Sequence, residues 1–362
     1  MSTTRGDSES VRIPSEFEDP QFQKLLNHVA PQDIPPSEDL CSATELEEFL
    51  RCLGEPPLSL IAVGDIMLGG RAKKTLSQSG SDSPFEAVMP ILRRASIVLG
   101  NLEGPLAQCS LRADRRFSYK ISPDHAASLT RAGINVLTFA NNHALDCGTA
   151  GVIETLETLA RAGAACIGAG VNERAAHSPA ILMAGEWRVG LLGYYWNRRY
   201  AATADLPGVA NGTRTALEAD IRSLRERADR VVVTFHWGVP YDRVPSESAR
   251  RKARLAVDLG ADVVIGHHPH IIQPFEIHRG RPIFYSVGNF TFGSRNSRAE
   301  GLLVGIRFEE TQTVVNTCPL YVKNRDPRVN YQPKILRGKS AERVLRHLAD
   351  ISEPTGGDLR IE

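Results

Sequence analysis

The sequence predicts an α/β fold built on a largely parallel β-sheet, and two observations support this prediction. From Leu58 onward, short apolar runs rich in β-branched residues alternate with stretches of helical periodicity. Six of these runs end on Asp, Asn, Glu or His. Because alternating strands and helices give parallel strands whose carboxyl ends share one edge, we expect these polar side chains to converge there.

The chain of 362 residues divides by composition into three parts. Residues 1–56 are polar and punctuated by proline, with a predicted helix over Ala43–Cys52, and we interpret them as a partly disordered extension. Residues 57–351 form the predicted folded domain, which closes with an amphipathic helix over Ser340–Ile351. Residues 352–362 are a C-terminal tail.

Charge and cysteine content exclude several classes of protein. The 43 basic and 42 acidic side chains leave a formal net charge of +1, which gives no field that would attract nucleic acid. The first twenty residues contain no apolar leader segment, and no apolar run reaches the length of a membrane span. The six cysteines form no C-x-x-C pair. We therefore expect a cytoplasmic protein without a nucleic-acid partner or a membrane span.

The six polar strand ends can be followed along the chain. LSLIAVG ends at Asp65, ASIVLG at Asn101 to Gly104, INVLTFA at Asn141 to His143, RVVVTF at His236, DVVIG at His267 to His270, and PIFYSVG at Asn289. Helices are predicted between them, over residues 150–162 and 215–227. Taken singly, each end group has an ordinary structural explanation, such as a helix cap, a turn or a hydrogen-bonded histidine. Six such ends together favour a shared site.

The residue types at this edge predict a metal centre. Imidazoles, carboxylates and an amide oxygen, with no thiolate among them, suit Mn, Fe, Zn or Mg better than a structural zinc site. We expect two divalent transition-metal ions, because a pair about 3.5–4 Å apart can act jointly on one phosphoryl group. The predicted metal ligands are Asp65, Glu103, Asn142, His236, His268 and His270.

Other residues near the predicted centre are candidates for catalysis and for substrate binding. His143 is free to protonate a leaving group, oriented by Asp146 three residues later. Arg71 follows Asp65 closely enough to touch a substrate anion. The full set of possible substrate-binding residues is Arg71, Asn101, His267, Trp237, Tyr241 and Asn289.

Six motifs in fixed order carry a resemblance to a known family. They are VGDIMLGGR, NLEGPL, FANNHALDCG, HWGVPY, GHHPHIIQPFE and YSVGNFTFG. Over residues 58–351 the chain resembles the bacterial CapA family, which is known for capsule and poly-γ-glutamate synthesis and looks like a diverged relative of the calcineurin-like metallophosphoesterases. The resemblance implies a sandwich of two mostly parallel or mixed β-sheets flanked by helices. It also implies motif roles for Asp65, Glu103, Asn142, His143, His236, His268 and His270.

The chain departs from the pattern of those relatives in three places. Metallophosphoesterases usually begin with Asp-x-His, whereas here Met67 follows Asp65, and thioether is a poor ligand for such ions. Their second motif carries a bridging Asp, for which Glu103 stands in from a different spacing. After HWG, relatives commonly have Glu-Tyr, whereas this chain has Pro240-Tyr241.

Three functional hypotheses follow. The first is a metal-dependent hydrolase of a phosphoester or a γ-glutamyl-type amide, with an anionic small molecule or a polyglutamate-type chain as substrate. The second is a non-catalytic subunit or binding module for polyglutamate-type synthesis. The third is a metal-dependent enzyme of small-molecule biosynthesis. An ATP-driven ligase is disfavoured, because the chain contains no G-x-x-x-x-G-K-[ST] loop.

Overall fold

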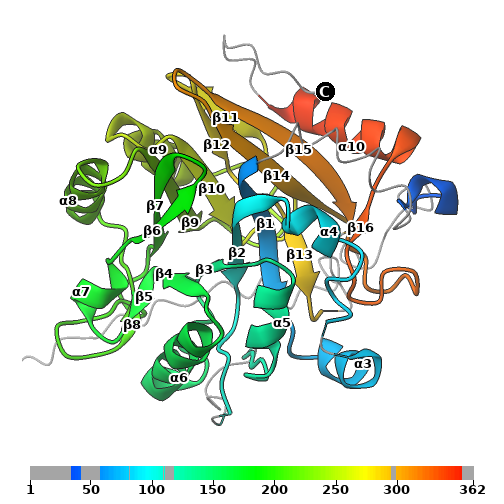
Figure 1. The fold of residues 1–362 in the computed structure, drawn as a ribbon, viewed down its shortest axis with the longest axis horizontal. Coiled ribbons are helices and arrows are strands. Elements are labelled where there is room, and N and C mark those ends of the chain that lie inside the picture. Colours follow the sequence, from blue (N-terminus) through cyan, green and yellow to red (C-terminus); the bar gives the residue numbers. More distant parts are fainter. Residues whose placement is uncertain are drawn as a thin grey trace, which may run out of the picture. The chain divides into compact units, whose positions relative to one another are not determined.

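Two β-sheets packed face to face form the centre of the domain (Figure 1). The computed structural model describes residues 34–41, 58–80, 82–108, 110, 118–294 and 299–352. The predicted helix over residues 43–52 lies outside these residues, as do most of the predicted N-terminal extension and nearly all of the C-terminal tail.

The first sheet has eight strands in the order β16-β15-β14-β1-β2-β3-β4, with β13 also paired to β1. Its strands are β1 Leu58–Met67, β2 Ala95–Leu102, β3 Val136–Thr138, β4 Ala165–Ile167, β13 Asn289–Phe292, β14 Glu300–Phe308, β15 Thr313–Tyr321 and β16 Lys334–Ile335. The strands β13, β1, β2, β3 and β4 pair in parallel, whereas β14, β15 and β16 are antiparallel. The sheet is therefore mixed.

The second sheet has six strands in the order β11-β12-β10-β9-β7-β6. Its strands are β6 Ala180–Ala184, β7 Trp187–Tyr195, β9 Arg230–His236, β10 Val263–His267, β11 Phe275–His278 and β12 Arg281–Phe284. The central strands β7, β9, β10 and β12 are parallel, and both edge strands are antiparallel. A small third sheet pairs β5 Ala169–Gly170 with β8 Gly208–Val209.

Helices cover the outer faces of both sheets (Figure 1). Beside the first sheet lie α4 Met89–Leu92, α5 His125–Arg131 and α6 Gly148–Arg161, with α3 Ala72–Ser79 after β1. The second sheet is covered by α8 Arg214–Arg225 and α9 Glu247–Asp258, and α7 Glu173–Ala176 packs on the small sheet. The last helix is α10 Gly338–Ile351. None of the helices in the described ranges is long and apolar enough to cross a bilayer.

The alternation of side chains along β1 explains why two layers form. Leu60 and Ala62 join the apolar core between the sheets, while Ile61 and Val63 join the core under the helices. This is the two-residue period of a strand that is buried on both faces. The predicted fold class, an α/β sandwich of two mixed sheets flanked by helices, is confirmed.

One predicted strand end is placed differently. The run PIFYSVG does not continue as one strand to Asn289; β12 ends at Phe284 in the second sheet, and Asn289 begins β13 in the first. Gly288, with φ of +73°, makes this change of sheet possible. Asn289 then lies in register with Asp65.

Part of the predicted extension contacts the domain. Ser37–Asp39 form the short 3-10 helix η3, and Leu40 bridges to Leu336. The Asp39 carboxylate accepts a hydrogen bond of 3.0 Å from the Ser340 backbone N–H in the first turn of α10. The described stretch before β1 therefore packs near α10 and β16.

Candidate metal centre

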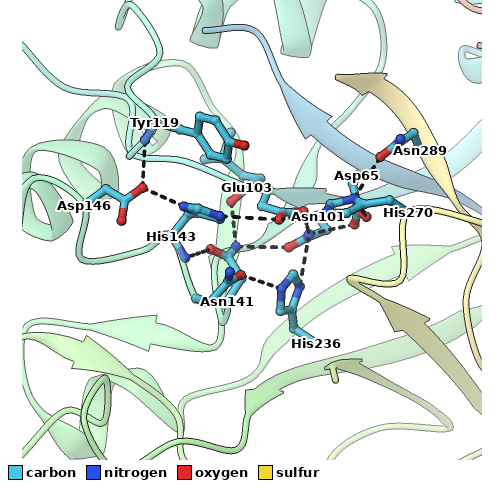
Figure 2. A network of polar contacts seen from close by, with 12 residues as sticks. Asp65, Asn101, Glu103, Tyr119, Asn141, His143, Asp146, His236, His270 and Asn289 are labelled. Carbon is cyan, nitrogen blue, oxygen red and sulfur yellow. Dashed lines mark hydrogen bonds and ion pairs between the residues drawn. The ribbon is translucent and has the colours of Figure 1, made fainter. Parts of the chain in front are cut away.

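The predicted polar strand ends meet at one edge of the two sheets (Figure 2). The first sheet contributes Asp65 from β1, Asn101 from β2 and Asn289 from β13. The second sheet contributes His236 from β9 and His267 from β10. Glu103, Asn141 to His143, His268 and His270 lie in the loops that follow these strands. The parallel pairing of each sheet brings residues distant in sequence together.

Asn101 lies at the middle of the cluster. Its Nδ2 donates to Asp65 Oδ1 at 2.8 Å and lies 3.3 Å from both Glu103 Oε2 and His236 Nδ1. Its Oδ1 accepts a hydrogen bond of 3.1 Å from Asn141 Nδ2. One amide therefore contacts ligand candidates from both sheets. This makes Asn101 a positioning residue in the cluster.

Glu103 is a buried carboxylate with an unsatisfied oxygen. The side chain is fully buried, and Oε1 makes no hydrogen bond within the described part of the chain. That oxygen lies 3.5 Å from His270 Nε2 and 3.9 Å from His143 Nε2. Burial raises the pKa of Glu103 well above its usual range, and the charges of Asp65 and Asp146 add to this despite the opposing effect of His270. A cation beside Oε1 would relieve this unfavourable burial.

The pKa of Asp65 is shifted in the opposite direction to that of Glu103. Burial alone would raise its pKa, but contacts with His267 and His270 hold the pKa well below the usual range. Its Oδ2 lies 3.0 Å from His270 Nδ1, and its Oδ1 lies 3.4 Å from His267 Nδ1. Asp65 is therefore ionised at neutral pH, as a metal ligand must be.

Two of the histidines are held neutral. Burial, reinforced by the charge of His270, lowers the pKa of His268 to about 3. Burial and His268 also lower the pKa of His236 well below its usual range. Burial would lower the pKa of His270 too, but Glu103 and Asp65 outweigh it and raise that pKa to about 9. Neutral imidazole is the form that binds metal, so His236 and His268 are ready ligands.

The backbone of the GHHPH segment is strained. His268 has φ of +98° and His270 has φ of +56°, both in the region that side chains other than glycine rarely adopt. Such conformations cost about 1–3 kcal/mol each and cluster at functional sites. Nitrogen atoms of both rings lie near Glu103 and form with it a group of possible ligands.

His143 and Asp146 form the predicted pair beside the cluster. His143 Nδ1 lies 2.6 Å from Asp146 Oδ2, which also accepts a hydrogen bond of 2.7 Å from the Tyr119 backbone N–H. With Nδ1–H bound to the carboxylate, Nε2 faces Glu103 (Figure 2). Both side chains are buried, so solvent does not compete strongly for these contacts.

The two asparagines of the FANNH segment have separate roles. Asn141 is buried and donates to Leu102 O at 2.7 Å, while its Oδ1 accepts from the His143 backbone N–H. Asn142, the predicted ligand, is half-buried, and its Oδ1 lies 2.8 Å from His236 Nε2. Asn141 fixes the loop, and Asn142 faces the second sheet.

The donor set fits a divalent metal. The structure contains two groups of three side chains, and within each group the possible ligand atoms all lie within 4.8 Å of one another. One group is Asp65, Glu103 and His236, and the other is Glu103, His268 and His270. Glu103 belongs to both groups. Buried atoms without a hydrogen bond among the described residues include Glu103 Oε1 and His268 Nδ1. Unpaired buried acceptors of this kind are costly unless a cation satisfies them.

The Met67 thioether is engaged within the chain. Its side chain is buried in the core under the helices, and Sδ accepts a hydrogen bond of 3.2 Å from the Gly69 backbone N–H. The departure seen in the Asp-x-Met motif therefore corresponds to a packing residue.

A family profile described as "Bacterial capsule synthesis protein PGA_cap" matches residues 59–294, which is more than half of the chain. The chain belongs to this family. It is 35% identical over 240 residues to the "PGA biosynthesis protein CapA" of Bacillus subtilis (strain 168), covering 65% of this chain and 63% of that protein. It is 31% identical over 283 residues to the "Capsule biosynthesis protein CapA" of Bacillus anthracis, covering 75% and 69%. The match thus spans less than two thirds of the B. subtilis relative.

Solved structures with a similar chain path include nucleotidases and phosphatases. A 5′-nucleotidase precursor from Thermus thermophilus aligns with a TM-score of 0.48 and 12% identity, over 81% of this PGA_cap chain and 58% of the other. A novel phosphatase from Mycoplasma pneumoniae aligns with a TM-score of 0.43 and 14% identity, over 80% and 98%.

The predicted substrate-binding residues fall into two groups. Asn101, His267 and Asn289 are buried within the cluster, where Asn289 Oδ1 lies 3.0 Å from His270 Nδ1. Trp237, Tyr241 and Arg71 make up the second group. The Trp237 indole is buried, stacks on Phe235 and donates to Tyr285 O.

Tyr241 and Arg71 are more accessible. Tyr241 is half-buried, with its ring 6.1 Å from that of His270. Arg71 is exposed at the start of α3, and its backbone N–H donates to Gly293 O. Two residues of the cluster, Asn141 and Tyr119, were not predicted to be ligands, catalytic residues or substrate-binding residues. Asn141 stood visibly beside Asn142, whereas Tyr119 lies in a segment with no motif signal.

Proposed function

We propose that this PGA_cap protein is a metal-dependent hydrolase that cleaves a phosphoester or a γ-glutamyl-type amide in capsule or poly-γ-glutamate metabolism. The names of the two Bacillus relatives support the biological setting. The chemistry of the cluster supports hydrolysis. The anionic substrate and the cytoplasmic location inferred from the sequence are part of this proposal.

The observation that carries the proposal is that two groups of ligand candidates share Glu103. One group adds Asp65 and His236 to this carboxylate, and the other adds His268 and His270. Asn142 would complete the set from beside His236. Two divalent ions held there would lower the pKa of a water molecule and neutralise charge on the reacting oxygen.

The protein itself supplies acid catalysis and orientation. Asp146 accepts the Nδ1–H of His143 and fixes the ring, so that the Nε2–H of the protonated form points toward the cluster. This proton would go to the leaving oxygen or nitrogen as its bond to phosphorus or carbon breaks. Asn101 holds Asp65 and Glu103 in place during the reaction.

A paired assay tests the proposal. The purified protein, supplied with Mn²⁺ or Zn²⁺, is incubated with a nitrophenyl phosphodiester and separately with a γ-glutamyl peptide, and product release is followed. We expect turnover of one substrate class, loss of turnover in EDTA and recovery on adding metal back. A protein that binds metal but turns over neither class would contradict the hydrolase assignment.

The position of Met67 favours a second candidate function. The Met67 thioether accepts a hydrogen bond from the Gly69 backbone N–H and lies in the core. The histidine ligand that metallophosphoesterases usually have at this position is therefore absent. The alternative is a binding module that holds a polyglutamate-type chain without cleaving it. Calorimetric binding of a poly-γ-glutamate oligomer, with no shortening of the oligomer in the presence of metal, would favour this candidate over the hydrolase.

A further inference from the structure

Tyr119 is held beside the cluster by three contacts. Its ring lies 4.3 Å from the His143 ring, centre to centre, and 5.9 Å from the Phe292 ring in an edge-on arrangement. Its backbone N–H donates to Asp146 Oδ2 at 2.7 Å. These contacts use the ring and the main chain of Tyr119, and phenylalanine would make all three.

The hydroxyl group is the part of Tyr119 that these contacts leave unexplained. It makes no hydrogen bond to any residue that the structure describes. The ring of Tyr119 lies against that of His143, whose Nε2 lies 3.9 Å from Glu103 Oε1. Figure 2 shows the ring extending from its backbone across the side of the cluster where Glu103 and His143 lie. The hydroxyl therefore lies beside the proposed ligands on a ring that is already fixed.

The surroundings of the cluster show where a substrate can enter. Asp65, Glu103, His236 and His267 are almost completely buried. Tyr119, Asn142, His268 and Tyr241 are half-buried and so form the side of the cluster that solvent reaches. A ligand arriving from solvent would meet Tyr119 on this side.

We propose that the Tyr119 hydroxyl donates a hydrogen bond to an oxygen of a tetrahedral anionic group, such as a phosphoryl group, bound at the metal-loaded cluster. This inference rests on the proposed function. A phenol is a neutral donor at pH 7, and a fixed donor aimed at developing negative charge needs no reorganisation. The same ring keeps His143 in place, so one residue orients both the acid and the anion.

The test measures binding of inorganic phosphate to the Mn²⁺-loaded protein by calorimetry, before and after Tyr119→Phe. This change keeps the ring and the backbone hydrogen bond and removes only the hydroxyl. A hydrogen bond to a charged group is worth enough to weaken phosphate binding by roughly tenfold or more. Metal content and melting temperature should stay at the wild-type values.

Tyr321→Phe is the matched control. It removes a hydroxyl that donates to Asp326 at 3.1 Å, and phosphate affinity should not change. Equal phosphate affinity in wild type and Tyr119→Phe would overturn the role of Tyr119 and leave the hydrolase proposal standing. Absence of phosphate binding by metal-loaded wild type would overturn the role of Tyr119 and count against the phosphoester form of the hydrolase, but not against the amide form.

Discussion

Glu103 and Glu276 are both buried glutamates, but their surroundings differ in kind. The Glu276 carboxylate accepts hydrogen bonds of 2.7 Å from Arg254 Nε and from the Tyr285 hydroxyl, and Arg250 lies 3.7 Å away. Among the described residues, the Glu103 side chain accepts one long hydrogen bond of 3.3 Å from Asn101, and its Oε1 accepts none.

The pKa values follow from these surroundings. Burial alone would raise the pKa of Glu276, but Arg254 and Tyr285 outweigh it and hold the pKa below the usual value. Burial raises the pKa of Glu103 with too little compensation. The comparison teaches that a carboxylate with a structural role is satisfied by its own chain, whereas one with unpaired atoms among imidazoles is arranged for a cation from outside.

The largest effect should come from His143, whose Nε2 faces Glu103. Changing His143→Ala should lower turnover by about 10²–10⁴-fold, because general acid catalysis contributes that much. Metal content should stay near wild type. A nitrophenyl substrate, whose leaving group needs little protonation, should lose less than an alkyl ester or amide.

The control is His278→Ala, which removes an imidazole that contacts Asp258 at 2.9 Å. Turnover of this variant should match wild type. If His143→Ala instead lowers metal content as much as turnover, its role is ligation and not acid catalysis.

The second prediction exchanges each glutamate for glutamine. Glu103→Gln should remove most of the bound metal, while the free energy of unfolding in EDTA changes by less than about 1 kcal/mol, because an amide of similar size replaces a carboxyl group whose charged form is disfavoured by burial. Glu276→Gln should keep the metal but lower the free energy of unfolding by about 1–3 kcal/mol, because Arg250 and Arg254 lose their charged partner. Urea unfolding and elemental analysis measure both. Loss of metal from Glu276→Gln, or full metal content in Glu103→Gln, would contradict the different roles assigned to the two glutamates.

The third prediction concerns pH. Burial would lower the pKa of His270, but Glu103 and Asp65 raise it to about 9, and the pKa of Glu103 is also raised. His270 therefore carries a proton at neutral pH without metal, and a metal ion must displace that proton. Affinity for Mn²⁺ should rise with pH below about 9, by about tenfold per pH unit for each proton released. Calorimetric titrations at pH 6, 7 and 8 check this, and an affinity independent of pH would show that the ligands are already deprotonated.

The smallest effect should come from the N-terminal segment, which our account places outside the metal chemistry. Deleting residues 1–50 should leave the domain folded with unchanged metal content. It should cost about 1 kcal/mol of unfolding free energy, because the bond from Ser340 to the Asp39 carboxylate at the start of α10 is lost. Circular dichroism and urea unfolding measure this. Aggregation of the shortened chain would show that the segment covers part of the core.

The fold and most of the cluster were accessible from sequence because both depend on local pattern. Apolar runs specify strands, and parallel pairing then brings their carboxyl ends together, so Asp65, Glu103 and His236 could be grouped without coordinates. The sequence did not predict which side chains of the loops after the strands would face the cluster. Whether Asn141 or Asn142 faces His236 depends on backbone geometry after β3, and adjacent residues of one type give no signal for this choice.

Three residues show where sequence reasoning stops. Trp237 follows His236 directly, yet the alternation of side chains along the backbone turns its indole into the core against Phe235. Asn289 was expected at the end of a strand and instead begins one, because Gly288 allows the chain to change sheets. Tyr119 reaches the cluster from a segment whose path is set by packing against His143 and Phe292.

The most direct test of our account is anomalous diffraction from crystals grown with Mn²⁺. The account predicts two anomalous peaks about 3.5–4 Å apart, with the Glu103 carboxylate between them, Asp65 and His236 beside one peak, and His268 and His270 beside the other. No anomalous peak at the cluster, or peaks that do not touch Glu103, would contradict the claim that this carboxylate is arranged for metal.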